Sequence, residues 1–398
     1  MPDVIVVGGG PAGAGTALRL ARQGFSVSLL ERHRLPRHKA CAEYMSPGVV
    51  RQLHRLGVGE AVERAAGARL DGFTLFAGDR SFTGRFAGAP VHAAPQFGLG
   101  IARSTMDAIL VRAAADAGVD VQENARVIDL LWKGDGVAGV QLLQAGRRHD
   151  MAAALVIGAD GIRSVVAHRL QAFEPRKGME RIALVAHLGG IEGLTSRGEM
   201  HVGRGGYCGV APLGNGVANV AMVLKDAAPR IRGRTDAFFW DFLRTLPNLS
   251  GRLDRAETVR PVMAIGPLAK RTRVLCENGV LLVGDAGGYF DPFTGQGVHR
   301  ALVTGAMAAH VAGDALRRGD VSRQSLLPYE QRRRKTLRSS HAVEWLVQQF
   351  LGRPVLFNRA VRRLATDQAM ADTLIGVTGD IVPPGRVLNP WFLARLGI

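Results

Sequence analysis

One short segment near the N-terminus has the residue types and the spacing that bind a nucleotide phosphate. The segment GGGPAG satisfies the pattern G-x-G-x-x-G. Its glycines permit a tight turn and let backbone N–H groups approach a pyrophosphate at the N-terminus of the following helix. We therefore expect a phosphate site formed by Gly8, Gly10, Pro11, Ala12 and Gly13.

A carboxylate follows at the position where such a site needs one. Ser26 to Leu30 has the composition of a second strand, and Glu31 ends it. A carboxylate at this distance from the glycines accepts hydrogen bonds from the hydroxyls of an adenosine ribose. It favours a free ribose over a 2′-phosphate, so the segment predicts FAD or NAD rather than NADP. We assign Arg32 and Lys39, which follow on the chain, to the same cofactor site.

A second motif decides between the two cofactors. Leu282 to Gly288 (LVGDAGG) is predicted to be a strand that stops at an aspartate, and a loop with proline and glycine then leads into a helix. The aspartate would accept the ribityl hydroxyls of a flavin, and the positive end of the helix suits the negative charge of a reduced flavin. An NAD enzyme needs no such second cofactor-binding segment, so we predict FAD. The residues of this part of the site are Gly284, Asp285, Pro292, Gln296, Gly295 and Gly297.

These motifs must be positioned by a parallel sheet with crossing helices. Residues 3–31 read as one βαβ unit, and helical periodicity returns at 49–66, 104–117, 236–246 and 297–316. The region from about 180 to 265 is strand-like, and the chain after 316 is predicted to be helical to about residue 380. We predict a discontinuous FAD-binding domain over 1–69, 101–179 and 266–325, a substrate-binding sheet domain over 70–100 and 180–265, and a helical C-terminal segment over 326–398.

The bulk composition narrows the class of protein. The chain has 398 residues, 47% of them hydrophobic and 21% charged, as is ordinary for a globular protein of more than one domain. Three scattered cysteines predict neither a disulfide framework nor a metal site. The net charge of +17 comes from dispersed arginines without a nucleic-acid module, so no nucleic-acid partner is expected. Neither a signal peptide nor a transmembrane segment is recognised, and a cytoplasmic location is predicted.

Together with a third motif, these stretches resemble the para-hydroxybenzoate-hydroxylase-like flavoproteins. The third motif, Ile157 to Ser164, is similar to the DG fingerprint of that group, and the resemblance assigns Asp160 and Gly161 to the cofactor site. Arg103 matches the family arginine near the ribityl and pyrophosphate groups. The resemblance covers roughly residues 3–320. It implies an α/β fold with a glutathione-reductase-type, Rossmann-like FAD-binding domain and an inserted, mostly antiparallel β-sheet substrate domain.

The branch of this group is indicated by the segment from Arg37 to Pro47. It resembles the K-x-C-G segment of geranylgeranyl-reductase-like members, although Ala42 replaces the glycine after Cys41. The tryptophan of the reductase substrate motif is missing from Tyr207 to Pro212. No tryptophan lies in a halogenase motif. The candidate catalytic residues are Cys41, Pro292 and Gly295, and His299 is a minor candidate that more often would be a packing residue.

The reaction that we predict first is hydroxylation. An FAD-dependent monooxygenase would use NAD(P)H and O2 on a hydrophobic aromatic, quinone or polyketide-like substrate. The alternative is a geranylgeranyl-reductase-like enzyme that reduces prenyl double bonds, and a third interpretation is a non-enzymatic electron-transfer or sensor flavoprotein. The basic segment from Tyr329 to Phe350 is interpreted as a docked helix. A membrane surface or an acidic carrier protein would be the partner of its basic face if it is interfacial.

Overall fold

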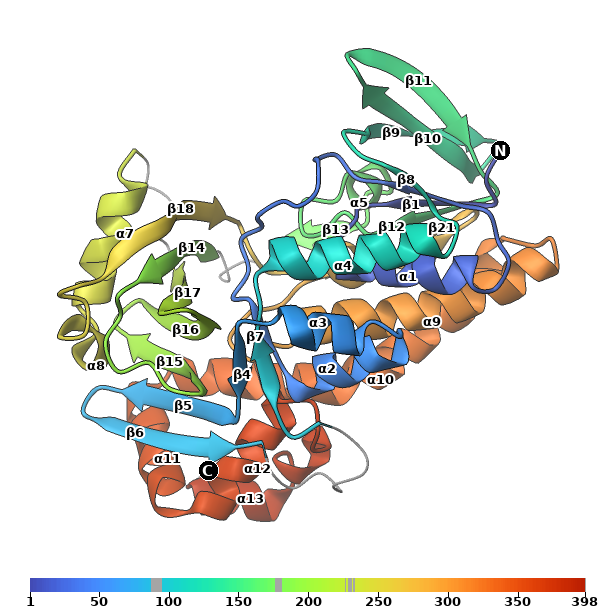
Figure 1. Ribbon diagram of the computed structural model, residues 1–398. Helices are drawn as coiled ribbons and strands as arrows, with labels where there is room; N and C mark the ends of the chain where they lie inside the picture. Colours follow the sequence, from blue (N-terminus) through green and yellow to red (C-terminus); the bar gives the residue numbers. More distant parts are fainter. Residues whose placement is uncertain (87–94, 176–180, 226, 228–230, 232, 398) are drawn as a thin grey trace.

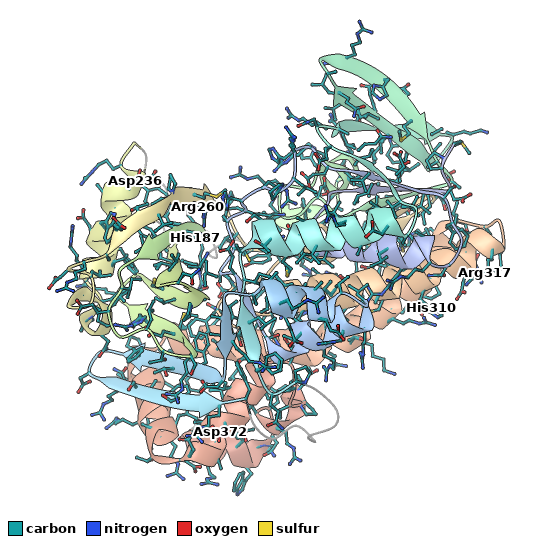
Figure 2. All side chains as sticks on the ribbon, viewed as in Figure 1. His187, Asp236, Arg260, His310, Arg317 and Asp372 are labelled. Carbon is teal, nitrogen blue, oxygen red and sulfur yellow. The ribbon has the colours of Figure 1, made fainter. Side chains whose placement is uncertain are left out.

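The structure is a computed structural model that describes residues 1–86, 95–175, 181–225, 227, 231 and 233–397. Figure 1 shows two lobes, one around strand β1 and helices α1, α4 and α9, and the other around strands β14 to β18. Helices of the C-terminal segment lie beneath the second lobe in this view. Figure 2 marks Asp372 among these helices and marks His310 and Arg317 on α9.

A six-stranded sheet forms the centre of the first lobe. Its order is β20-β21-β12-β1-β2-β8, and all neighbours are parallel except β20 and β21. The strands are β1 (Val4–Val7), β2 (Val27–Leu30), β8 (Asp120–Gln122), β12 (Leu155–Gly158), β20 (Cys276–Glu277) and β21 (Val280–Leu282). The chain adds β2 and β8 on one side of β1, then β12 and β21 on the other. Ligands of such sheets bind at the carboxyl ends of the strands where the order reverses, here β1 and β12.

Both faces of this sheet are covered, which explains why its central strands are uniformly apolar. Helices α1 (Pro11–Ala21), α4 (Arg103–Asp116) and α9 (Gly297–Arg317) share one core with the sheet, and an antiparallel meander covers the other face. The meander consists of β9 (Arg126–Lys133), β10 (Gly136–Gln144) and β11 (Arg147–Ala152). Helices α1 and α9 pack closely at Gly305. A side chain at this position would lie only 2.6 Å from Thr16 Oγ1.

A seven-stranded sheet forms the second lobe, in the order β18-β14-β17-β16-β15-β5-β6. All neighbours are antiparallel except β15 and β5. The strands are β5 (Gly72–Ala77), β6 (Arg80–Arg85), β14 (Arg181–Gly189), β15 (Arg197–Gly203), β16 (Gly206–Gly214), β17 (Val217–Lys225) and β18 (Glu257–Ile265). One face packs on α7 (Thr235–Arg244) and α8 (Pro247–Ser250), and the other shares a core with the C-terminal helices.

Smaller elements connect the two sheets. They are β3 (Tyr44–Met45), α2 (Pro47–Arg55), α3 (Gly59–Ala65), β4 (Ala68–Leu70), β7 (Gly98–Gly100), α5 (Val165–Arg169), β13 (Phe173–Pro175), β19 (Lys270–Thr272) and the 3-10 turn η1 (Gly284–Gly287). Strands β3, β7 and β4 form a small sheet of their own. The helix predicted over 49–66 is two helices, because the chain takes a left-handed turn at Gly57, where φ is +75°.

The C-terminal segment is helical as predicted, and its helicity extends into the proline-containing tail. It contains α10 (Arg323–Leu351), α11 (Pro354–Thr366), α12 (Gln368–Thr378), the 3-10 turn η2 (Pro384–Arg386) and α13 (Pro390–Leu396). The basic helix α10 is anchored by Tyr329, which is fully buried and donates a hydrogen bond to the Leu282 carbonyl at 2.7 Å. Within the described ranges, no helix combines the length and the apolar composition that crossing a membrane requires.

The two sheets, their order and the helical tail confirm the predicted α/β fold, with a Rossmann-like sheet, a mostly antiparallel second sheet and C-terminal helices. The domain limits that the sequence suggested remain an expectation.

Candidate functional site

The glycine turn after β1 is shaped by two close backbone approaches. Gly8 has φ +105°, and a side chain there would lie 2.7 Å from the Ala159 carbonyl oxygen. A side chain at Gly13 would lie 1.9 Å from the Gly8 carbonyl oxygen. Pro11 and Ala12 begin α1, where a proline costs no helical hydrogen bond. The turn therefore leaves the N-terminus of α1 open toward the cavity beside it, as a diphosphate requires.

Glu31 lies directly after β2 and is tied to this turn. Its carboxylate accepts hydrogen bonds from Gly9 N at 2.9 Å and from His33 N at 3.1 Å, and it pairs with Arg37 at 3.0 Å. Burial alone would raise the pKa of Glu31, but Arg37 and the two N–H donors outweigh it and hold the pKa below its ordinary value. Glu31 is therefore an anion that can accept ribose hydroxyls.

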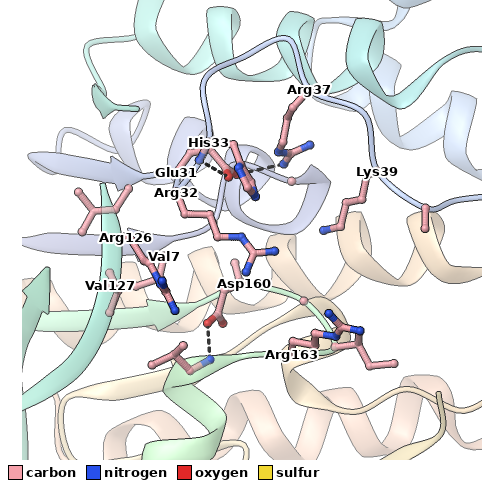
Figure 3. A pocket seen from close by; sticks show the side chains of 18 of the residues that line it. Val7, Glu31, Arg32, His33, Arg37, Lys39, Arg126, Val127, Asp160 and Arg163 are labelled. Carbon is pink, nitrogen blue, oxygen red and sulfur yellow. Dashed lines mark hydrogen bonds and ion pairs between the residues drawn. The ribbon is translucent and has the colours of Figure 1, made fainter. Parts of the chain in front are cut away.

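A cavity of about 370 Å³ opens along the carboxyl ends of β1, β2 and β12. Figure 3 shows its lining, with Arg32, Lys39 and Asp160 around the opening and Glu31 paired with Arg37. The predicted cofactor residues that line it are Gly8, Gly10, Glu31, Arg32, Lys39, Asp160 and Gly161. In the sequence these residues lie up to 153 positions apart, from Gly8 to Gly161, and the fold brings them to one wall.

Two cations lie beside the glycine turn. A side chain at Gly10 would lie 3.7 Å from Arg103 Nη2 and 3.9 Å from Lys39 Nζ. Burial, together with Arg103 and Arg37, lowers the pKa of Lys39. The turn and these cations fit a diphosphate, whose charge would relieve the repulsion between them.

Arg103 is held in place by an aspartate that the sequence did not indicate. Asp107, one helical turn further along α4, accepts from Arg103 Nε and Nη2, both at 2.8 Å, and from Arg37 Nη1 at 2.7 Å. Burial would raise the pKa of Asp107, but the two guanidinium groups hold it below its ordinary value. The i,i+4 spacing of Arg103 and Asp107 was a signal available in the sequence.

Asp160 has one oxygen in structural use and one without a partner. Its Oδ2 accepts from Val165 N at 2.7 Å, ahead of α5. Its Oδ1 is buried and makes no hydrogen bond within the described part of the chain. Burial raises the pKa of Asp160. Gly161, with φ +80°, makes the turn after it. An orphaned oxygen in the wall of the cavity fits a ligand with hydrogen-bond donors.

The second motif meets the first one directly. Gly284 has φ +56°, and a side chain there would lie 2.8 Å from Ala12 Cβ. Asp285 is half-buried, and burial raises its pKa despite Lys39 and Arg103 nearby. These contacts place the acceptor predicted for the ribityl chain near the cations of the diphosphate site.

The start of α9 completes this part of the cofactor site. Gln296 precedes the helix and Gly297 is its first residue. The Gln296 side chain donates to Asp380 Oδ1 at 2.6 Å, so it is tied to the C-terminal segment. His299 Nδ1 lies 3.1 Å from the same carboxylate, which places this minor candidate in an anchoring contact.

Pro292 and Gly295 line a second, apolar pocket of about 90 Å³. It lies between the loop before α9 and the C-terminal helices, on the face of the seven-stranded sheet that packs against those helices. Besides these two, the lining comprises Ala42, Tyr44, Phe73, Leu75, Phe82, Glu199, Met200, Gly209, Val210, Ala211, Phe293, Thr294, Val347, Leu374, Ile375 and Thr378. Cys41 lies at the junction, with its side chain beside the Arg103 guanidinium.

A buried polar cluster behind Cys41 was missed by the sequence interpretation. Glu43 is fully buried with φ +54°, and its carboxylate contacts His187 Nε2 at 2.5 Å and accepts from Asn219 Nδ2 at 2.9 Å. Asn219 also donates to the Cys41 carbonyl at 3.0 Å. The partners are 144 and 176 residues away from Glu43 in the sequence, so no local spacing indicates them.

Comparison with known proteins agrees with this geometry. Residues 1–343 match a family model described as FAD binding domain. The chain is 31% identical over 340 residues to digeranylgeranylglycerophospholipid reductase 1 of Methanococcoides burtonii, covering 83% of this chain and 79% of that protein. It is 30% identical over 340 residues to the reductase of the same name from Methanospirillum hungatei, covering 83% and 80%.

Solved structures share the whole fold. A geranylgeranyl bacteriochlorophyll reductase-like protein from Thermoplasma acidophilum has a TM-score of 0.82 at 23% identity, over 100% of this chain and 98% of that one. A flavin-dependent brominase has a TM-score of 0.83 at 19% identity, over 100% of both chains. The chain belongs to the FAD-binding family of flavoproteins and is an FAD-dependent oxidoreductase.

Proposed function

We propose that the protein is an FAD-dependent reductase that saturates carbon–carbon double bonds in an isoprenoid chain. The observation that carries this proposal is the apolar pocket that joins Pro292 and Gly295 to the sheet and the C-terminal helices. Most of the side chains that line it are aliphatic or aromatic, which suits a hydrocarbon chain. Relatives that match about four fifths of this chain are reductases of geranylgeranyl lipids by name, so we place this alternative ahead of hydroxylation.

Each part of the site has a task in this reaction. The glycine turn, Lys39 and Arg103 would hold the diphosphate of FAD, Glu31 its ribose, and Asp285 its ribityl chain. When bound, the flavin supplies a hydride for one carbon of the double bond, and a proton must reach the other carbon. The pocket walls hold the alkene and exclude water. We assign positioning or proton delivery to Cys41, which lies at the junction of the cofactor residues and the pocket.

The electron donor is part of the proposal. A nicotinamide nucleotide, NADH or NADPH, would reduce the bound cofactor between turnovers. Hydroxylation is the second candidate function. The observation that favours it is the strand from Tyr207 to Pro212, which contributes Gly209 rather than a large aromatic residue to the pocket wall.

The deciding experiment uses the holoenzyme with geranylgeraniol and a nicotinamide donor, with and without oxygen, and follows the product mass. The proposal expects a gain of two hydrogens per double bond in both atmospheres. A gain of one oxygen atom that disappears without air would overturn it in favour of the hydroxylase. Leu374→Trp, which narrows the pocket from α12, should abolish turnover and retain FAD. Thr373→Trp on the same helix, outside the pocket lining, is the matched control.

A further inference from the structure

One end of the seven-stranded sheet carries a row of polar side chains. Asn219 on β17, His187 on β14 and Arg260 on β18 lie opposite one another in register, and Figure 2 marks His187 and Arg260 on this part of the sheet. Leu184, Ala186 and Leu188 of β14 pack into the core with α7. Because side chains alternate along a strand, the row points to the opposite face, toward the first lobe.

The carboxylate that reaches this row is already fully engaged. Glu43 Oε1 accepts from Arg103 N at 2.8 Å, and Oε2 is bonded to His187 and Asn219. Glu43 is therefore close to Arg260 without serving as its hydrogen-bond partner. Burial lowers the pKa of Arg260, and Glu43 and Cys41 only partly compensate.

Arg260 is the unexplained member of the row. The residue is only 6% exposed. Its Nε, Nη1 and Nη2 atoms are all buried and make no hydrogen bond to any residue that the structure describes. Burying a charged group without partners is costly, and buried donors in native proteins almost always have an acceptor. A buried guanidinium with all its donors free therefore indicates a missing acceptor.

The surroundings of Arg260 favour an anion as that acceptor. The His38 ring lies 6.0 Å from the His187 ring, edge to face. Burial, with Arg260 and His187 as neighbours, lowers the pKa of His38. Among the described residues, Glu43 is the carboxylate that faces these groups, and it is already bonded to His187. The nearby Arg103 is paired with Asp107. His38 and residues 263–265 of β18 also line the cofactor cavity, so the row lies beside a space that ligands enter.

We propose that Arg260 anchors an oxyanion site that takes a phosphate or carboxylate group of a ligand beside the cofactor cavity, where His38 and residues 263–265 line that cavity. The planar guanidinium matches both groups with two parallel hydrogen bonds. Arg260 is not among the residues that line the cofactor cavity with Gly10 and Lys39. The oxyanion site deepens the proposed function and rests on it for the identity of the ligand: a phosphorylated isoprenoid and the phosphates of the nicotinamide donor share this chemistry.

The register of the sheet sets the distance between Arg260 and the apolar pocket, and this distance suits an amphiphilic substrate. Ala211, in the wall of the apolar pocket, lies opposite Asn219, which lies opposite His187 and then Arg260. Three strand spacings separate Ala211 from Arg260, which is about 14 Å. A ligand with its anionic group at Arg260 could therefore place its chain in the pocket on the same face of the sheet.

The test is direct binding to the holoenzyme, so that it does not depend on turnover. Arg260→Met and Arg260→Lys are compared with Arg255→Met, which removes a neighbouring arginine whose side chain is 85% exposed. Titrants are geranylgeranyl diphosphate, geranylgeraniol, NADH and NADPH. We expect Arg260→Met to weaken either the isoprenoid diphosphate or the nicotinamide nucleotides about 10- to 100-fold. Arg260→Lys should lose less, and geranylgeraniol should bind as before.

The two sources of the oxyanion are distinguished by which titrant is weakened. Unchanged affinity for all four titrants would overturn the oxyanion site, and so would a loss of FAD itself, since the cofactor would then be the partner. Reduction of geranylgeraniol by the variant would show that the proposed function survives such a failure. Thermal unfolding adds a second readout: removing an unpaired buried charge should leave the ligand-free protein at least as stable. A destabilised Arg260→Met with normal affinities would make Arg260 structural and refute the site.

Discussion

Replacing Asp107 by asparagine would remove the charge on which two arginines of the cofactor site depend. Asp107 is fully buried and accepts three hydrogen bonds from Arg103 and Arg37. Arg103 is itself only 6% exposed. Asparagine has a similar shape, but it offers one acceptor oxygen and no charge, so the buried guanidinium of Arg103 would be left without a counterion.

The expected magnitude follows from burial. Removing one partner of a buried ion pair costs about 3–5 kcal/mol, because the remaining charge is stranded. The matched control is Asp129→Asn, which breaks the pair of Asp129 with Arg169, whose side chains are 46% and 43% exposed. Exposed pairs contribute about 0–1 kcal/mol. The two variants make the same chemical change, but Asp107 is fully buried and serves two arginines, whereas Asp129 is half-exposed and serves one.

The assay is urea unfolding of the FAD-free protein, followed by titration with FAD. Asp107→Asn should lower the free energy of unfolding by several times the effect of Asp129→Asn. It should also weaken FAD binding, since Arg103 lies beside the glycine turn. A difference of less than about 1 kcal/mol between the two free energies of unfolding, with FAD affinity unchanged, would refute the reasoning. Breaking a buried ion pair is expected to cost about 3–5 kcal/mol.

Acidity provides an independent check on the same residue. The pKa of folded Asp107 lies below its ordinary value. Its stabilising contribution is therefore fully present above the pKa of the unfolded state, about 3.9, and is lost as the pH falls through the lower folded pKa. The stability gap between the protein and Asp107→Asn should hence close in acid. A gap that is constant down to the acid unfolding transition would contradict the assigned charge state.

Two further substitutions test the site and its surroundings. Gly13→Ala should yield a protein that purifies without FAD, because the new carbon would lie 1.9 Å from a backbone oxygen, whereas Gly251→Ala, with nothing within 4 Å, should stay yellow. Asp380→Ala should raise KM for geranylgeraniol, the proposed substrate, and retain FAD, because it frees the segment after α12 from Gln296. Asp372→Ala on α12, whose carboxylate accepts a hydrogen bond from β6 instead, should change neither. An unchanged KM in the Asp380 variant would show that this anchor does not shape the pocket.

Local patterns predict the backbone of the cofactor site well. The glycines at 8 and 284 adopt positive φ angles, and α4 and α9 begin and end within one residue of the periodic segments. These features depend on neighbours in the sequence, which composition and spacing record. The break between α2 and α3 shows the limit, since the apolar spacing continues across a residue that turns the chain.

Side-chain partnerships between distant segments could not be predicted. Glu43 meets His187, and Gln296 meets Asp380, only because sheets and helices far apart in the chain pack together. Similarly, β5 pairs with β15 in parallel although the first residue of β15, Arg197, comes 120 positions after the last residue of β5, Ala77. Such contacts have no local period. A single sequence therefore predicts the cofactor but not the charges that surround Arg260.

The strand order of the first sheet also bears on how the protein is made. The phosphate turn is synthesised well before the strands that complete its sheet, since β12 ends at Gly158 and β21 at Leu282. Helix α9, which covers α1, ends only at Arg317. At a synthesis rate of about 5–20 residues per second, the apolar surface of α1 waits for this cover for tens of seconds. The complete cofactor site needs both the glycine turn and Gly284 to Gly287, so it can form only after most of the chain has been synthesised.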